Sequence, residues 1–457
     1  MNRVTRRIWI MALFLAVLLG GTGFFVGEFM MKSDQWVVSA GSPHVYNANN
    51  IGFGSVKDRD GVLLLDITNQ RTYSPDLTIR RSTLHWLGDR EGYISAPAIS
   101  HYAAQMSGFD YLNGIYAYGG AGGQAKLTIS SRVQKTALEA MGDRKGTIAV
   151  YNYKTGEILC AVTTPTFDPD NVPVISLDEN GAYEGIYLNR FIQSCYIPGS
   201  IFKVVTAAAA LDCIEDIEDQ TFYCSGAVEF GVDRVTCEHA HGSVNLQSAL
   251  ARSCNCAFAE IALQIGAQRM TEYVERFGIT TSVSFDGITT ATGNYDVSNA
   301  APVELAWSCI GQYTDQINPC TFMTFMGAIG GGGEAAQPYL VDQITVGNEV
   351  TYRAEPVSMA QVMDPEIADI VRRYMRSGVE NVYGAENFPG LTVCAKSGTS
   401  QLGGGAVSNA MFAGFVADET YPLAFIVVVE NGGYGSSTCV PILSKVLAEC
   451  KAVMDGN

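Results

Sequence analysis

Basic residues are in short supply in this chain. Its 457 residues hold 29 Lys and Arg against 46 Asp and Glu, which gives a formal net charge of −17. No run of Lys or Arg interrupts this acidity, and a negative field of that size repels phosphate backbones. The composition therefore argues against a nucleic-acid partner.

Histidine is scarcer still, with five in the whole chain. Only His239 and His241 lie near residues of catalytic type. A Ser-His-Asp arrangement needs a histidine between nucleophile and carboxylate, so this scarcity makes such a triad a weak hypothesis.

Long apolar runs are absent except for one near the N-terminus. Residues 8–27 carry no charged side chain, and twenty residues at helical rise span roughly 30 Å, the thickness of a bilayer core. No small-residue cleavage site follows, so we expect an uncleaved transmembrane anchor rather than a signal peptide. Three arginines lie within residues 1–7. The positive-inside rule therefore predicts a cytoplasmic tail, a single pass through the cell membrane and an extracellular remainder.

Cysteine, in contrast, is plentiful, with 12 scattered along the chain. The scatter does not fit a small disulfide scaffold, and we expect most of these thiols to be reduced and buried.

One denser group contains two cysteines and two histidines, Cys224, Cys237, His239 and His241. A hairpin over residues 225–236 could bring the two cysteines within the ~5.5–6 Å between Cα atoms that a disulfide requires, and export permits oxidation. We favour a Cys224–Cys237 disulfide. Zinc bound by the Cys2His2 set and free thiols remain as alternatives.

The hydrophobic pattern predicts an α+β fold. Lys154-Thr155-Gly156 separates two strand-like runs in the manner of a hairpin turn. The helix expected from Ser200 to Leu211 is apolar all round and so belongs in the interior, and the glycine-rich stretch 118–123 resembles a linker. Strands, then helices, then strands again favour one sheet with helices on both faces. The expected strands are 146–151, 157–162, 391–395, 410–416 and 423–430, with a terminal helix over 440–454.

The first motif with chemical content is Pro198-Gly199-Ser200-Ile201-Phe202-Lys203. Ser200 and Lys203 are three residues apart, which places them on one face of a helix. A serine hydroxyl needs an adjacent base to become a nucleophile, and a lysine in an apolar helix loses solvation, which lowers its pKa. Alone, the pattern is equally typical of a capping serine and a surface lysine.

Two further motifs follow along the chain. Ser253 and Asn255 flank one residue, so both polar groups can face one cleft. Lys396-Ser397-Gly398-Thr399 ends a strand-like run. Its lysine can hold a carboxylate as a point charge, and its glycine allows close approach of a ligand to the backbone. Separately, each motif is equally typical of a polar turn.

Together and in this order, the three motifs resemble the signature of penicillin-binding proteins and serine β-lactamases. Gly146 to Pro169, Asn189-Arg190, Gly311-Gln312 and Asn409 to Glu430 resemble segments of the class B transpeptidase domain. The resemblance implies a penicillin-binding, β-lactamase-like domain with an antiparallel sheet flanked by helices. The predicted organisation is a cytoplasmic tail at 1–7, an anchor at 8–27, a small N-terminal domain at 28–124 and a transpeptidase domain at 125–457.

The resemblance also implies roles for the motif residues. Ser200 would attack the penultimate D-Ala carbonyl of a peptidoglycan stem peptide ending in D-Ala-D-Ala, and Lys203 would accept its proton. Ser253 would relay that proton to the departing D-Ala, while Asn255 would position Lys203. The residues expected to hold the terminal carboxylate are Lys396, Ser397 and Thr399, with Gly398 between them.

By the same resemblance, β-lactams would inhibit the reaction, and no metal or organic cofactor is needed for it. A glycosyltransferase of the SEDS family is the expected partner in the membrane. Alternative hypotheses are a D,D-carboxypeptidase or β-lactamase of the same superfamily, or a non-catalytic β-lactam sensor or wall-binding scaffold. Fluorescent penicillin labelling combined with the lifetime of the acyl-enzyme would separate them.

Overall fold

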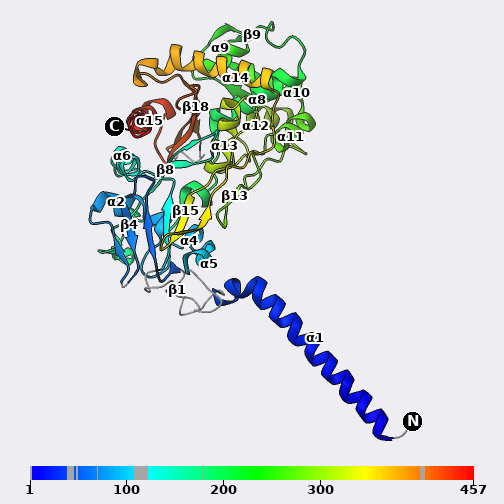
Figure 1. The fold of residues 1–457 in the computed structure, drawn as a ribbon. Coiled ribbons are helices and arrows are strands. Elements are labelled where there is room, and N and C mark those ends of the chain that lie inside the picture. Colours follow the sequence, from blue (N-terminus) through cyan, green and yellow to red (C-terminus); the bar gives the residue numbers. More distant parts are fainter. Residues whose placement is uncertain are drawn as a thin grey trace.

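The structure is a computed structural model that describes residues 3–38, 46–47, 50–68, 70–107, 122–178, 180–401 and 407–456. Figure 1 shows a long N-terminal helix projecting from a body of sheets and helices. Most of the glycine-rich stretch expected to be a linker, residues 118–121, lies outside the described residues.

A five-stranded antiparallel sheet forms the centre of the larger part of the body. Its order is β17 (Val393–Ser400), β18 (Asn409–Val416), β19 (Leu423–Val429), β7 (Gly146–Asn152) and β8 (Ile158–Thr164). Every residue of β7, β8, β18 and β19 is buried, because helices cover both faces. Strands buried on both faces appear in a sequence as continuous apolar runs, which is why these strands were predictable.

Helices α6 (Ser131–Met141) and α15 (Gly435–Met454) pack on one face of this sheet, while α13 (Pro319–Gly330) packs on the other (Figure 1). Successive strand residues serve the two faces in turn. Ile148 and Val150 belong to the core under α6 and α15, while Ala149 and Tyr151 belong to the core on the opposite side. The structure thus confirms the expected α+β fold with helices on both faces.

A second sheet has six strands in the order β16 (Glu349–Arg353), β15 (Val341–Val346), β6 (Gln124–Leu127), β3 (Ser55–Lys57), β4 (Leu63–Asp66) and β5 (Thr72–Tyr73). Its pairs are antiparallel except for β3 with β6. The sheet joins segments from both sides of residue 124. The domain division at that residue remains a prediction.

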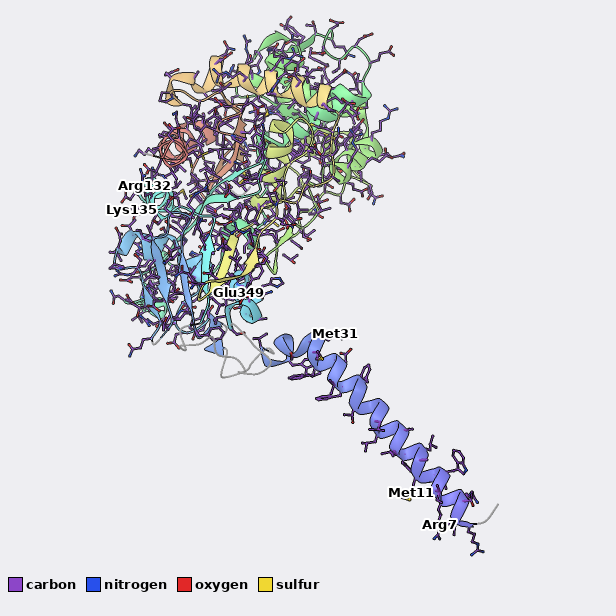
Figure 2. The ribbon with its side chains drawn as sticks, viewed as in Figure 1. Arg7, Met11, Met31, Arg132, Lys135 and Glu349 are labelled. Carbon is purple, nitrogen blue, oxygen red and sulfur yellow. The ribbon has the colours of Figure 1, made fainter. Side chains whose placement is uncertain are left out.

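Helix α1 (Arg3–Val37) is long and apolar enough over Arg3–Ser33 to cross a membrane. Most of its large apolar side chains are exposed. In Figure 2, Met11 lies far from the body and Met31 at the end of the helix nearer to it. Arg7 lies near its free end.

The remaining elements connect or cover the two sheets. Their helices are α2 (Leu77–Ser82), α3 (Leu84–Leu87), α4 (Pro97–His101), α5 (Ala103–Ser107), η1 (Ile175–Leu177), α7 (Arg190–Gln193), η2 (Gly199–Phe202), α8 (Lys203–Cys213), α9 (Leu246–Ala251), α10 (Asn255–Ile265), α11 (Ala267–Arg276), α12 (Pro302–Ser308), α14 (Pro365–Gly378), η3 (Val379–Tyr383) and η4 (Ala385–Asn387). Their strands are β1 (Tyr46–Asn47), β2 (Asn50–Ile51), β9 (Phe222–Cys224), β10 (Ala227–Phe230), β11 (Asp233–Thr236), β12 (Gly242–Val244), β13 (Ser284–Phe285) and β14 (Ile288–Thr289).

Candidate active site

Ser200 lies on a tight turn that leads directly into helix α8 and packs against strand β17. The helix expected from Ser200 begins instead with the 3-10 turn η2 and becomes α-helical at Lys203. Gly199 has φ +56°, and a methyl group there would come within 2.7 Å of the Thr399 carbonyl oxygen. The Gly199 N–H also donates to the Gly311 carbonyl at 2.7 Å. Glycine at this turn therefore lets the serine approach β17 closely.

The Lys203 amine is at the centre of a hydrogen-bonded group. Its Nζ lies 3.0 Å from Ser200 Oγ and 3.0 Å from Ser253 Oγ. It also donates to the Ser253 carbonyl at 2.9 Å and to Asn255 Oδ1 at 2.6 Å. The structure thus brings together the four residues predicted to be catalytic, although they come from segments some fifty positions apart.

The partners of Lys203 indicate which proton state the geometry suits. A carbonyl and an amide oxygen can only accept hydrogen bonds, so they occupy two N–H groups of the amine. A neutral amine has two such groups and one lone pair, which can accept one hydrogen bond from a neighbouring serine hydroxyl. The arrangement therefore fits a proton acceptor.

Electrostatics favour the same neutral state of Lys203. The side chain is fully buried, and this loss of solvation, together with the positive charge of Lys396, holds its pKa well below the usual lysine range. A neutral amine next to a serine hydroxyl is the base that serine activation requires.

Ser253 and Asn255 are held by local backbone geometry. Ser253 has φ +59°, an uncommon conformation for a residue with a side chain, and Cys254 caps the start of α10. The Asn255 Nδ2 group donates to the Thr236 carbonyl at 2.7 Å. This bond fixes the amide so that its oxygen faces Lys203.

Lys396 lies on the edge strand β17 and is buried. Its Nζ donates to the Ser397 carbonyl at 2.8 Å and to the Tyr383 hydroxyl at 3.2 Å. No carboxylate pairs with it among the described residues. Loss of solvation lowers the pKa of Lys396 to about 7. A buried cation without an anion is suited to receive one from a ligand.

A cavity of about 420 Å³ joins these groups. It is lined by Ser200, Ser253, Asn255, Ser397 and Thr399, and so contains most of the predicted site. Gly398 lies behind the wall, where a methyl group would come within 2.8 Å of the Pro198 carbonyl oxygen. Ser200, Ser253 and Asn255 therefore face the same space as Ser397 and Thr399.

Several residues that line this cavity were not predicted from the sequence. They include the aromatic residues Trp307, Tyr383 and Tyr434. The Tyr383 hydroxyl accepts from the Ser397 N–H at 3.2 Å and lies 3.1 Å from Ser397 Oγ. Tyr383 ends the π-helical turn η3, and such turns frequently occur at functional sites, but no local sequence signal marks this one.

The disulfide expected between Cys224 and Cys237 is wrong. The predicted hairpin forms as β10 and β11, but both cysteines are free and their Sγ atoms are 3.7 Å apart. A physical reason is the competition for Cys237 Sγ, which accepts N–H groups of Asn255 and Cys256 at 3.1 and 3.4 Å. The broader expectation that most cysteines are reduced and buried is confirmed.

Comparison with known proteins identifies the family. Residues 146–448 match the penicillin binding protein transpeptidase domain, and the chain belongs to this family. Among curated proteins it is similar to Stage V sporulation protein D of Bacillus subtilis, with 26% identity over 87% of this chain and 61% of that protein. It is also similar to peptidoglycan D,D-transpeptidase PbpA of Mycolicibacterium smegmatis, with 28% identity over 68% of each chain. The chain therefore spans about three fifths to two thirds of the length of these relatives.

Solved structures have the same fold. The D,D-transpeptidase domain of a peptidoglycan glycosyltransferase from Eggerthella lenta has a TM-score of 0.75 and 26% identity, covering 89% of this chain and 99% of that one. Penicillin-binding protein A of M. tuberculosis, as a ceftriaxone acyl-enzyme complex, has a TM-score of 0.75 and 22% identity, covering 87% and 98%. The fold and family expected from the three motifs are therefore confirmed.

Proposed function

We propose that this protein is a serine D,D-transpeptidase that cross-links peptidoglycan stem peptides and is inhibited by β-lactams. The observation that carries the proposal is the buried Lys203 amine, 3.0 Å from both serine hydroxyls. The family membership and the names of the curated relatives support the same activity.

Acylation would begin at Ser200. Neutral Lys203 takes the hydroxyl proton while Ser200 Oγ attacks the carbonyl carbon of the penultimate D-Ala. Backbone N–H groups of Ser200 and Thr399 would stabilise the oxyanion, which is typically worth a few kcal/mol of barrier. As the intermediate collapses, the C–N bond breaks, and Ser253 passes the proton from Lys203 to the departing D-Ala amine.

Deacylation would transfer the peptide to an amine of a second stem peptide. The amine attacks the Ser200 ester, its proton returns through Lys203, and an amide bond replaces the ester. Throughout acylation, protonated Lys396, with Ser397 and Thr399, would hold the terminal carboxylate. A β-lactam carboxylate would occupy the same position while its ring carbonyl acylates Ser200.

Replacing the nucleophile provides the direct test. We expect Ser200→Ala to abolish covalent labelling by fluorescent penicillin. Among the described serines of the cavity, only the hydroxyls of Ser200 and Ser253 contact a buried lysine. In this scheme Ser253 passes a proton to the leaving group and does not attack. Ser436→Ala, which removes another serine of the cavity wall, should label normally. A mass-spectrometric adduct on any residue other than Ser200 would refute the assignment.

The fate of the acyl-enzyme distinguishes transpeptidation from the alternatives. A transpeptidase should hold the penicilloyl group for many minutes and transfer a donor peptide to an added amine. Rapid release of hydrolysed penicillin would favour a β-lactamase, and release of D-Ala without transfer would favour a carboxypeptidase.

We infer that α1 anchors the protein in the cell membrane with the catalytic domain outside. The apolar surface of α1 and the arginines in its first two turns support this orientation. A SEDS-family glycosyltransferase is the partner implied by the family resemblance, and α1 is the segment through which it would be contacted within the membrane.

A further inference from the structure

A group of sulfur atoms lies directly behind the Ser253–Asn255 motif. Cys224 ends strand β9, Cys237 follows β11, His241 precedes β12 and Cys254 caps α10. One ligand atom from each lies within 4.8 Å of all the others. Four segments therefore converge on one point, and the sequence pattern alone had suggested only three of these residues.

The distances within this group fit one tetrahedral ion better than a disulfide. At a zinc–sulfur length of ~2.3 Å and a zinc–nitrogen length of ~2.0–2.1 Å, tetrahedral angles place two sulfurs roughly 3.8 Å apart and sulfur and nitrogen roughly 3.6 Å apart. Cys224 and Cys237 Sγ are 3.7 Å apart, and Cys237 and Cys254 Sγ are 3.9 Å apart. Cys224 Sγ lies 3.4 Å from His241 Nδ1.

The surroundings of Cys237 also favour a thiolate. Its Sγ accepts two backbone N–H groups, from Asn255 and Cys256. Such N–H groups stabilise negative charge on the sulfur that accepts them. Thiolates, not thiols, bind metals.

We propose that Cys224, Cys237, Cys254 and His241 bind one zinc ion and that this ion fixes the segment carrying Ser253 and Asn255. Three sulfurs and one imidazole form a closed set of four protein ligands, which is typical of structural zinc. His239, expected in the zinc alternative, is exposed outside this set, and Cys254 takes its place.

The connection to the catalytic lysine is short. Cys254 lies between Ser253 and Asn255 in the chain, and the Asn255 N–H donates to Cys237 Sγ at 3.1 Å. The Asn255 side chain bonds to the carbonyl of Thr236, the residue before Cys237, and its oxygen accepts from Lys203. An ion that holds Cys237 and Cys254 in place would therefore also hold Ser253 and Asn255, two of the residues that contact the Lys203 amine. This second half of the inference rests on the proposed function.

Metal content tests the site without reference to activity. Full-length protein purified in detergent, incubated with zinc and freed of excess, should hold about one zinc per chain by elemental analysis. Cys224→Ser and Cys254→Ser should each reduce this to near zero. Cys213→Ser, distant from the group, and Cys256→Ser, whose Sγ is 3.5 Å from Cys237 but outside the proposed set, should retain it.

Cobalt substitution should give the intense visible bands and the sulfur-to-metal charge-transfer absorption of a tetrahedral thiolate site, with loss of both in Cys254→Ser. Wild-type protein without bound zinc, zinc retained in both Cys224→Ser and Cys254→Ser, or a Cys224–Cys237 disulfide found by thiol alkylation before and after reduction would each overturn the metal site.

Acylation kinetics test the coupling to Lys203. Removing zinc with a chelator should slow penicillin labelling of Ser200 roughly tenfold or more, the scale of effect seen when a supporting partner of a site is lost, and added zinc should restore it. Unchanged labelling after verified zinc loss would overturn the coupling. Ser200→Ala should bind zinc without labelling, so failure of the proposed function is distinguishable from failure of the metal site.

Discussion

Two buried lysines, Lys203 and Lys396, contact residues that line the cavity but suit opposite proton states. The Lys203 amine donates to the Ser253 carbonyl and to Asn255 Oδ1, which can only accept hydrogen bonds. It also lies within hydrogen-bond distance of the Ser200 hydroxyl. Lys396 has neutral partners only and needs its positive charge to hold a carboxylate. The charge on Lys396 helps to keep Lys203 neutral, so the carboxylate-binding lysine also supports the role of the proposed base.

This pairing predicts a pH dependence of acylation. Burial lowers the pKa of Lys396 to about 7, so in the free protein its charge is present below that pH and lost above it. The second-order rate of penicillin labelling should therefore fall as pH rises through about 7, because this rate reports the free enzyme. Under saturating penicillin the fall should move to higher pH, since the bound carboxylate favours the charged lysine.

Lys396→Gln should label more slowly at pH 6 and lose this alkaline decline. Lys154→Gln, at an exposed position on the β7–β8 turn, serves as the control and should keep the wild-type profile. Identical pH profiles for Lys396→Gln and the wild type would contradict the role of Lys396.

At the scale of elements, the serine turn η2 is wedged between β17 and the segment after α12. Gly311 has φ +82°, and an alanine methyl there would overlap the Gly199 carbonyl oxygen and crowd Phe202. Gly199 itself donates to the Gly311 carbonyl. The position of Ser200 therefore depends on backbone contacts that only glycine permits.

We expect Gly311→Ala to destabilise the protein by about 3 kcal/mol, combining left-handed backbone strain with overpacking, and to slow penicillin labelling more than tenfold by moving η2. Gly347→Ala is a matched control, because Gly347 has φ +60° but nothing within 4 Å of the added methyl group. It should cost roughly 1 kcal/mol and label normally. Thermal unfolding and labelling rates measure both effects, and equal behaviour of the two variants would contradict the wedge.

How far the sequence predicted these elements depends on how local each signal is. Strands β7, β8, β18 and β19 are continuous apolar runs, so they were visible in the sequence. Ser200 and Lys203 share a local spacing, and the family resemblance connected them with Asn255. The structure adds what depends on distant pairing, such as β15 beside β6.

Residues without a local signal were missed for a related reason. Tyr383 reaches the cavity through a π-helical turn that no residue pattern announces. Cys254 was hidden as the unspecified middle residue of its motif. The pairing of β9 with β12 brings Cys224 beside Gly242, and only the three-dimensional packing of α10 places Cys254 with them. The disulfide prediction failed because it considered the hairpin alone.

At the scale of the whole molecule, α1 and the body suit different surroundings. Large apolar side chains of α1, including Phe14 and Leu18, are exposed, which is costly in water but favourable in a bilayer. Trp9 lies near the N-terminal end of α1, and the Trp36 ring near its other end packs against Phe25 and Phe29, with ring centroids 5.9 and 6.3 Å apart. Tryptophan is enriched at the two interfaces of a bilayer.

The charges at the two ends of α1 differ, and this difference predicts the orientation of the protein in the membrane. Arg3, Arg6 and Arg7 precede the apolar stretch, whereas Glu28 and Lys32 near its other end form an ion pair with no net charge. The excess of positive charge at the N-terminal end should keep that end in the cytoplasm.

In spheroplasts whose Ser200 carries fluorescent penicillin, added protease should therefore remove the full-length labelled band without lysis. A cytoplasmic marker protein should stay intact in the same sample, and an epitope placed before Arg3 should remain protected in the membrane fraction. Full protection of the labelled band until the spheroplasts are lysed would place the catalytic domain inside and reject this topology.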